Sequence, residues 1–218
     1  DKSDVLLIYG TTLNRLIEFD EKVTIPSLSM SLLNHLAQLK WQLKWNKTAK
    51  LTTGLQAMTQ DNANAVNATD TLIPNAQSVD LGGYVSLNYA YKKCNIQAGI
   101  RYDRRTIFGI DLPGQKNISF NALNGSVGAV FSSEKFVWRT SLSTGFRAPH
   151  LTELFSNGYH HGALRYEVGD AALVPEKASQ LDFTLEWNQA HGALVFNPFV
   201  SYIRDYIYLE PMGMLFDG

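Results

Sequence analysis

Apolar and polar residues alternate along several stretches of this chain. The clearest is "AQLKWQLKW", residues 37–45, where Ala, Leu and Trp occupy the odd positions and Gln and Lys the even ones. Because the side chains of a β-strand point to opposite faces with period two, this stretch predicts a strand with one apolar and one polar face. The same alternation recurs in residues 80–91, 95–103 and 177–188. An all-β protein is the fold class that this pattern favours.

The pattern predicts nine strands and no helix, over residues 4–19, 35–46, 50–60, 80–91, 95–103, 119–131, 136–145, 177–188 and 193–209. After residue 35 their connections alternate between turns of four or five residues and long loops at 61–79, 104–118 and 146–176. Alternate connections of an antiparallel up-and-down meander lie at opposite edges of the sheet. We therefore expect short turns at one edge and long loops at the other.

Large aromatic residues gather beside the short turns: Trp45, Tyr89, Tyr91, Phe131, Phe136 and Trp187. Outer-membrane barrels combine short periplasmic turns, longer extracellular loops and aromatic girdles at the lipid interface. Lipid offers no hydrogen bonds to a strand edge, so a membrane sheet has to close on itself. The arrangement predicts part of a transmembrane β-barrel, embedded in outer-membrane lipid.

Composition narrows the classes of function. Charged residues make up 18% of the chain, below the soluble average of about a quarter, and a net charge of -1 argues against a nucleic-acid partner. One cysteine excludes an internal disulfide and a cysteine-rich metal site. The sequence has neither an apolar run of transmembrane-helix length nor a signal peptide. We expect the chain to be a piece of a longer protein.

Two quoted segments carry a resemblance to a known family. "GFRAPHLTELF" (145–155), followed by "RYEVGDAALVPEKASQLDFTLEW" (165–187), resembles the barrel motif of TonB-dependent outer-membrane receptors. The matching positions are Gly145, Phe146, Arg147, Ala148, Pro149, Glu153, Leu173, Pro175 and Glu176. Residues 170–172 depart from the family, in which Asn-Pro-x is commoner. "GIRYDRR" (99–105) is also similar to a strand of the family, so the resemblance extends over most of the chain.

The resemblance implies a 22-stranded transmembrane β-barrel with a plug domain in its lumen. Residues 1–218 would be a partial barrel, with the plug and the closing strands outside them. Such a receptor in the outer membrane of a Gram-negative bacterium imports a scarce nutrient complex with energy relayed by TonB. The ligand is usually a ferric siderophore or haem, and in some relatives cobalamin, another metal complex or a glycan. No cofactor is implied.

Candidate ligand-binding residues lie in the loops or toward the lumen: Arg101, Arg104, Arg105, Arg147, His150, Tyr159, His160, His161 and Arg165. Each has a structural explanation beside the functional one. For the histidines the simpler interpretation is solvated loop positions, and for the arginines near residue 103 it is a salt-bridge cluster. Arg147 is expected to tie the base of its loop to a carboxylate, for which Glu153 and Glu176 are the candidates. No metal site is predicted.

Two alternatives remain open at this point: a soluble β-sandwich that binds carbohydrate, and a complete small structural outer-membrane barrel. The sandwich requires the apolar faces to pack against a second sheet. The positions that distinguish it from a barrel wall are Trp41, Leu43, Leu87, Phe183 and Leu185. Scattered acids and histidines without a nucleophile or phosphate motif predict that the chain is not an enzyme.

Overall fold

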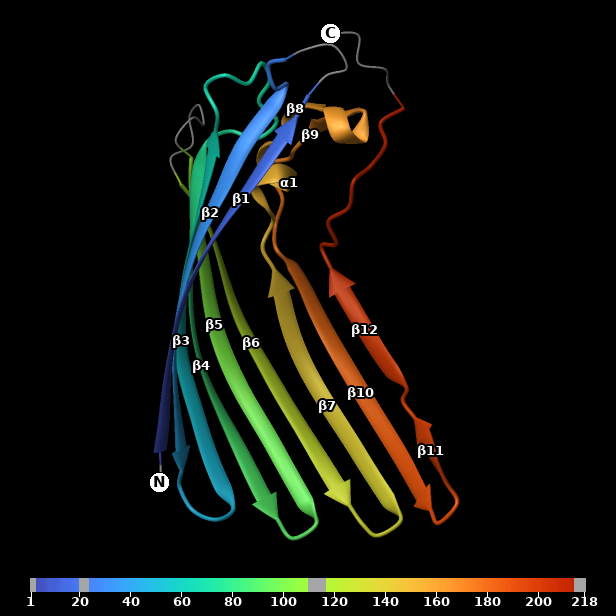
Figure 1. Cartoon of the computed structure of the whole chain (residues 1–218). Helices are drawn as coiled ribbons and strands as arrows, with labels where there is room; N and C mark the ends of the chain where they lie inside the picture. Colours follow the sequence, from blue (N-terminus) through green and yellow to red (C-terminus); the bar gives the residue numbers. More distant parts are fainter. Residues whose placement is uncertain (1–2, 20–23, 110–116, 214–218) are drawn as a thin grey trace.

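The computed structural model describes residues 3–19, 24–109 and 117–213. Its main feature is a curved antiparallel sheet with two open edges (Figure 1). The strands are β1 (Ser3–Glu18), β2 (Leu28–Lys44), β3 (Ala49–Asn64), β4 (Ala76–Tyr91), β5 (Cys94–Gly109), β6 (Asn117–Ser132), β7 (Phe136–Arg147), β10 (Glu176–Gln189), β11 (Gly192–Phe196) and β12 (Phe199–Arg204). Each pairs with its sequence neighbour from β1 to β7, β7 pairs with β10, and β10 pairs with both β11 and β12. The predicted meander is confirmed.

One predicted strand, 193–209, is divided in the structure. Leu185 pairs with Phe196 and Asp182 with Phe199, so β11 and β12 continue one register along β10. The interruption falls at Pro198, which has no N–H to donate to the ladder but still accepts a hydrogen bond from Phe183 N at 3.0 Å. Residues 205–209 lie outside the strand. The nine predicted ranges therefore correspond to β1–β7, β10 and the interrupted pair.

The strands extend further toward the loop edge than the sequence pattern predicts. β3 continues to Asn64 and β4 begins at Ala76, so the predicted loop at 61–79 shrinks to 65–75. β5 continues through much of the predicted loop at 104–118, and residues 110–116 lie outside the described ones. The 16 residues of these strands span about 50 Å, twice the apolar band of about 25 Å in a membrane barrel. The outer-apolar, inner-polar alternation fades at these ends, because the outer face becomes more polar and the inner face carries buried apolar residues such as Ile107 and Phe120.

The apolar face of the sheet is not covered by a second sheet. Trp41, Leu87 and Leu185 are 42%, 43% and 37% exposed, and Leu43 and Phe183 are half-buried beside neighbours on the same face. In the described residues the only other sheet is the small hairpin of β8 and β9. The chain exposes 14975 Å² for a mass of 24.3 kDa, whereas a compact monomer of that mass exposes about 10,000 Å². The sandwich interpretation is therefore wrong.

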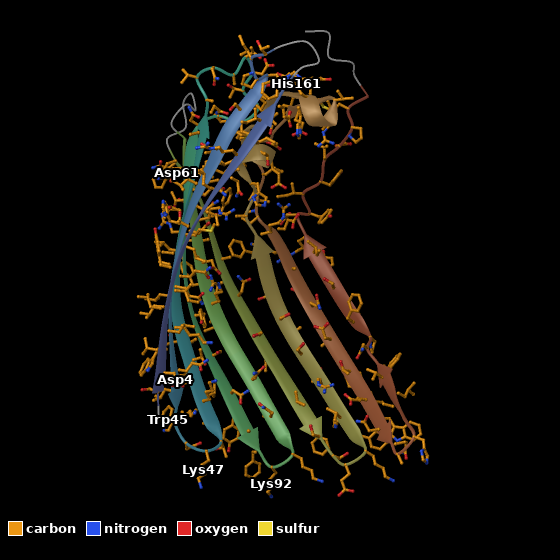
Figure 2. The ribbon with its side chains drawn as sticks, viewed as in Figure 1. Asp4, Trp45, Lys47, Asp61, Lys92 and His161 are labelled. Atoms are coloured by element: carbon orange, nitrogen blue, oxygen red, sulfur yellow. The ribbon has the colours of Figure 1, made fainter. Side chains whose placement is uncertain are left out.

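The short turns and the aromatic residues lie together at one edge, as predicted. The turns are residues 45–48, 92–93, 133–135 and 190–191, and Figure 2 shows Trp45, Lys47 and Lys92 there, with His161 at the opposite end. Phe136 stacks on Trp187 with 6.3 Å between ring centroids, and Phe131 contacts Trp138 edge-on at 5.8 Å. Among the described residues, no helix is long and apolar enough to cross a bilayer.

The long interruption at 146–176 is folded, contrary to the prediction that it contains neither helix nor strand. It holds α1 (Leu151–Phe155), β8 (Asn157–His160), a 3-10 turn (His161–Ala163) and β9 (Arg165–Val168). Figure 1 shows these elements near the upper end of the sheet, within its curve. Single turns and four-residue strands are too short to produce a recognisable period, so the sequence pattern misses them.

Candidate functional site

Residues 148–175, here called the mouth segment, pack against the inner face of the sheet at its loop edge. The buried apolar residues of the described chain gather there: Leu28, Met30, Leu72, Ile73, Ala76, Ile107, Phe120, Ala148, Leu151 and Leu154. Those on strands occupy the positions that alternate with the exposed apolar face. The protein core is therefore a small cluster beneath the mouth segment, and this cluster holds the segment inside the curve of the sheet.

The loop of residues 65–75 supports the mouth segment at close range. Asn157 N donates to Leu72 O at 3.1 Å. Gly158 lies so near this loop that a Cβ placed on it would be 2.8 Å from the carbonyl oxygen of Thr71. Asp70 N donates in turn to Ser27 O at 2.8 Å. The mouth segment, the 65–75 loop and the start of β2 consequently form one packed assembly.

Arg147, at the end of β7, binds both carboxylates that the sequence offered as its partners. Its Nε and Nη2 donate to the two oxygens of Glu176 at 3.0 and 2.8 Å, and Nη1 donates to Glu153 at 2.8 and 2.9 Å. The hydrogen bonds from Arg147 hold the pKa of Glu176 below its usual range against the opposing effect of burial. The same contact, opposed by burial and aided by Glu153, raises the pKa of Arg147 further above its already high value.

Glu153 also organises the start of α1. Its Oε2 accepts the backbone N–H of His150 at 2.8 Å, as the third-position acid of a helix start commonly does. The buried Pro149 precedes this turn. At the other end of the mouth segment, Asp170 departs from the family pattern but accepts the N–H of Ala172 at 2.8 Å, which closes a tight turn. The family motif thus builds the base of this loop.

One of the candidate histidines, His160, lies between two carboxylates. His160 Nδ1 is 3.1 Å from Glu167 Oε1, and its Nε2 is 3.5 Å from Glu18 Oε1 at the end of β1. Arg165 Nη2 contacts the same Glu167 oxygen at 2.7 Å. Burial raises the pKa of Glu167, but the hydrogen bonds from His160 and Arg165 outweigh it and leave that pKa below its usual range.

His161 and Tyr159 form a second contact of the same segment. His161 Nε2 is 3.0 Å from Asp70 Oδ2, and its ring meets that of Tyr159 edge-on with 4.9 Å between centroids. His150 is exposed at the start of α1. The described residues contain no group of three or more His, Cys, Asp and Glu side chains that could hold a metal ion.

The three arginines of "GIRYDRR" do not share one site. Arg101 pairs with Asp103 and donates to Gln56 at 3.2 Å on the inner face. Arg105 pairs with Asp80 at 2.6 Å, also on the inner face. Arg104 occupies the alternate position of β5 and faces outward with Tyr102. Of the three, only Arg101 and Arg105 are placed toward the lumen.

Sequence reasoning did not select Glu18, Asp70 or Glu167 as site residues. Glu18 and His160 are 142 positions apart, and only the inward fold of the mouth segment brings them together. The position of Glu18 at the end of a long strand is the one feature of the sequence that could have indicated a site residue there. A shallow groove on the inner face, lined by Gln97, Arg139 and Asp182 among others, lies toward the short turns and away from these residues.

Comparison with known proteins agrees with this geometry, an open barrel wall with a segment folded into its mouth. A family model described as TonB dependent receptor-like, beta-barrel matches residues 8–217. The chain therefore belongs to that family, whose members are receptors and transporters, and the resemblance noted from the sequence is confirmed. A comparison with curated proteins found no match.

Several solved structures share the fold at low sequence identity. The copper transporter OprC has a TM-score of 0.69 and 18% identity over 94% of this chain and 36% of that one. The FrpB iron transporter from Neisseria meningitidis (F3-3 variant) has a TM-score of 0.63 and 17% identity over 83% of this chain and 29% of its own. The ferric yersiniabactin uptake receptor FyuA from Yersinia pestis has values of 0.66 and 13%, over 94% and 34%. This chain spans about a third of the length of each.

Proposed function

We propose that this chain forms part of the wall and mouth of an outer-membrane receptor that imports a scarce nutrient complex with energy from TonB. The observation that carries the proposal is an uncovered apolar outer face combined with a polar segment folded into the mouth. The apolar face, bordered by aromatic residues, suits lipid contact. The mouth segment lies where an external ligand has to pass to reach the lumen.

We propose a ferric siderophore or haem as the substrate class. The iron and ferric yersiniabactin in the names of FrpB and FyuA support it, and the copper in the name of OprC supports metal complexes more broadly. Cobalamin, another metal complex and a glycan are the further candidates. In this proposal residues 1–218 supply part of a 22-stranded barrel, and the TonB complex acts through a plug domain outside them.

Within the mouth segment we assign ligand contact to His150, Tyr159, His161 and Arg165. His150 and Arg165 are exposed, the latter with 51% of its side chain accessible. Arg147 has its guanidinium occupied by two carboxylates, so its role is to position the segment. Arg101 and Arg105 line the path below, where each is already paired with an aspartate.

Uptake by the intact receptor tests this function. A strain that lacks its own receptors and expresses this one would be given radioactive iron as a siderophore complex or as haem, with labelled cobalamin and copper for comparison. We expect TonB-dependent uptake of an iron complex, reduced about tenfold or more by the double variant His150→Ala, Tyr159→Ala and unchanged by His191→Ala at a short turn on the opposite edge. TonB-independent uptake, or uptake insensitive to the mouth variants, would contradict the proposal.

A further inference from the structure

His160 is the only described histidine whose two ring nitrogens each face a carboxylate. Nδ1 lies 3.1 Å from Glu167 Oε1 and Nε2 lies 3.5 Å from Glu18 Oε1. A neutral imidazole carries one N–H, whereas the imidazolium ion carries two. Only the charged ring can therefore donate to Glu167 and at the same time present a positively charged N–H to Glu18.

We propose that His160 is a pH-dependent latch, whose doubly protonated ring bridges Glu18 of β1 and Glu167 of β9 and holds the mouth segment against the barrel wall in mildly acidic surroundings. Histidine side chains in general change charge between about pH 5 and 8. A ring with a single N–H has one proton to share between two negative groups. The contact with one of them is then lost.

The balance of charge around His160 indicates which contact is lost. Glu167 keeps a second cation, because Arg165 Nε and Nη2 contact its Oε1 at 2.8 and 2.7 Å. Glu18 accepts the backbone N–H of Gly162 at 3.1 Å, and in the described part of the chain His160 is its single charged partner. Its side chain is only 15% exposed. A carboxylate so little hydrated is costly beside a neutral ring, so the segment should separate from β1 first.

His161 supplies a matched comparison within the same turn. It faces one carboxylate, Asp70, at 3.0 Å from Nε2, and its other neighbour is the uncharged ring of Tyr159. A neutral imidazole can satisfy that single acceptor. Loss of the second proton therefore leaves the His161 contact in place, and the pH response is assigned to His160 alone.

A spin label near the latch measures it without any ligand. In the intact receptor, with Cys94 and every other native cysteine replaced by Ser, Leu164→Cys places the label on a residue that is 79% exposed at the end of the 3-10 turn. We expect the mobile population of the label to rise on the order of tenfold between about pH 5 and pH 8. His160→Gln should give a flat profile, since an amide side chain cannot gain a proton in this range.

Further variants separate the latch from general loosening. Glu18→Gln removes the second negative group and should also flatten the profile, whereas His161→Gln and the distant His191→Gln should retain it. A flat profile in the parent protein would overturn the proposal, as would a full response in His160→Gln or its loss in His161→Gln. If His160→Gln fails to fold, Glu18→Gln takes its place: a flat profile supports the latch, and a full pH response overturns it.

The latch deepens the proposed function, because it would govern access to the mouth of a receptor, and its physiological meaning rests on that function. The two can fail separately. A pH-dependent label with no TonB-dependent uptake would retain the latch and remove the receptor role. Uptake together with a pH-independent label would retain the receptor role and remove the latch.

Discussion

Arg147 joins three segments of the chain through a single guanidinium group. It lies at the end of β7, contacts Glu153 in α1 and contacts Glu176 at the start of β10. Glu176 also accepts the backbone N–H of Ile207 at 2.8 Å. The planar fork of arginine makes two paired contacts in different directions, which the single ammonium group of lysine cannot reproduce.

Arg147→Lys should therefore release the base of the mouth segment. We expect a loss of about 2 kcal/mol in the free energy that keeps this segment docked, since paired bonds to one carboxylate are lost and Glu176 remains largely buried. Hydrogen exchange of residues 148–175 in the intact receptor measures it. Arg139→Lys on the same strand is the control, because Arg139 makes one contact of 3.3 Å with Glu186. Equal effects of the two variants would refute the assignment.

The lowered pKa of Glu176 predicts a loss of docking in acid. Its pKa lies below the ordinary value of 4.5 because Arg147 donates to it. The stabilisation is complete above that value and is lost as the pH falls through the lower folded pKa. Pepsin should cut the mouth segment increasingly as the pH is lowered below 4.5. Glu176→Gln should be cut at every pH with a weaker pH dependence, and Glu134→Gln at a short turn should behave as the parent does.

At the scale of elements, the mouth segment begins beyond the point where β7 separates from β6. β6 and β7 pair only up to Ser126 and Ser143. Beyond them the Thr144 hydroxyl accepts the N–H of Gly125 at 2.9 Å, and the ladder ends. β7 stays with β10, and the chain beyond it turns inward. The fold of this region is decided by where strands separate, as well as by where they pair.

Gly169→Ala tests the close packing within the segment. A Cβ there would lie 2.6 Å from the backbone of Leu154 and Phe155, which cannot rotate away as a side chain does. We expect destabilisation of the docked segment by about 1–3 kcal/mol, read from faster hydrogen exchange in α1 and β9. Gly145→Ala is the matched control, since nothing lies within 4 Å of its Cβ position. Unchanged exchange in Gly169→Ala would show that the two backbones are not in close contact.

On the scale of the whole molecule, the two faces of the sheet have opposite environments. Leu87 is 43% exposed on the outer face, and the adjacent Asn88 is directed to the inner face. Short turns and stacked aromatic rings lie at one edge, and the buried core lies at the other. Such an arrangement is stable when lipid surrounds the outer face and polar groups or protein fill the inner one.

The variants Leu87→Arg and Asn88→Arg test the different environments of the two faces of the sheet. A charge on the lipid face costs from about 2–4 kcal/mol at the bilayer midplane down to about 0–1 kcal/mol near the interface, whereas a lumen position tolerates it. We expect a lower yield of folded, membrane-inserted receptor for Leu87→Arg and a yield near that of the parent for Asn88→Arg. Heat-modifiable migration in gels measures the folded fraction. The reverse order of yields would place the lumen on the other face.

The sequence alone determined the approximate strand ranges, their meander and which face of the sheet is apolar. These features follow from a period of two and from the alternation of short and long connections, and both are local properties of the chain. It also determined the class of partner for Arg147, because a guanidinium at a loop base seeks carboxylates and two of them stood in the same motif.

Only the tertiary structure decided what the long interruption does. Its short elements have no detectable period, and they form because apolar residues of β2, β5 and β6 bury them. The meeting of Glu18 with His160, and of Asp70 with His161, joins residues far apart in sequence. No local pattern encodes such contacts, since they arise when a curved sheet and an inward-folded segment share one mouth.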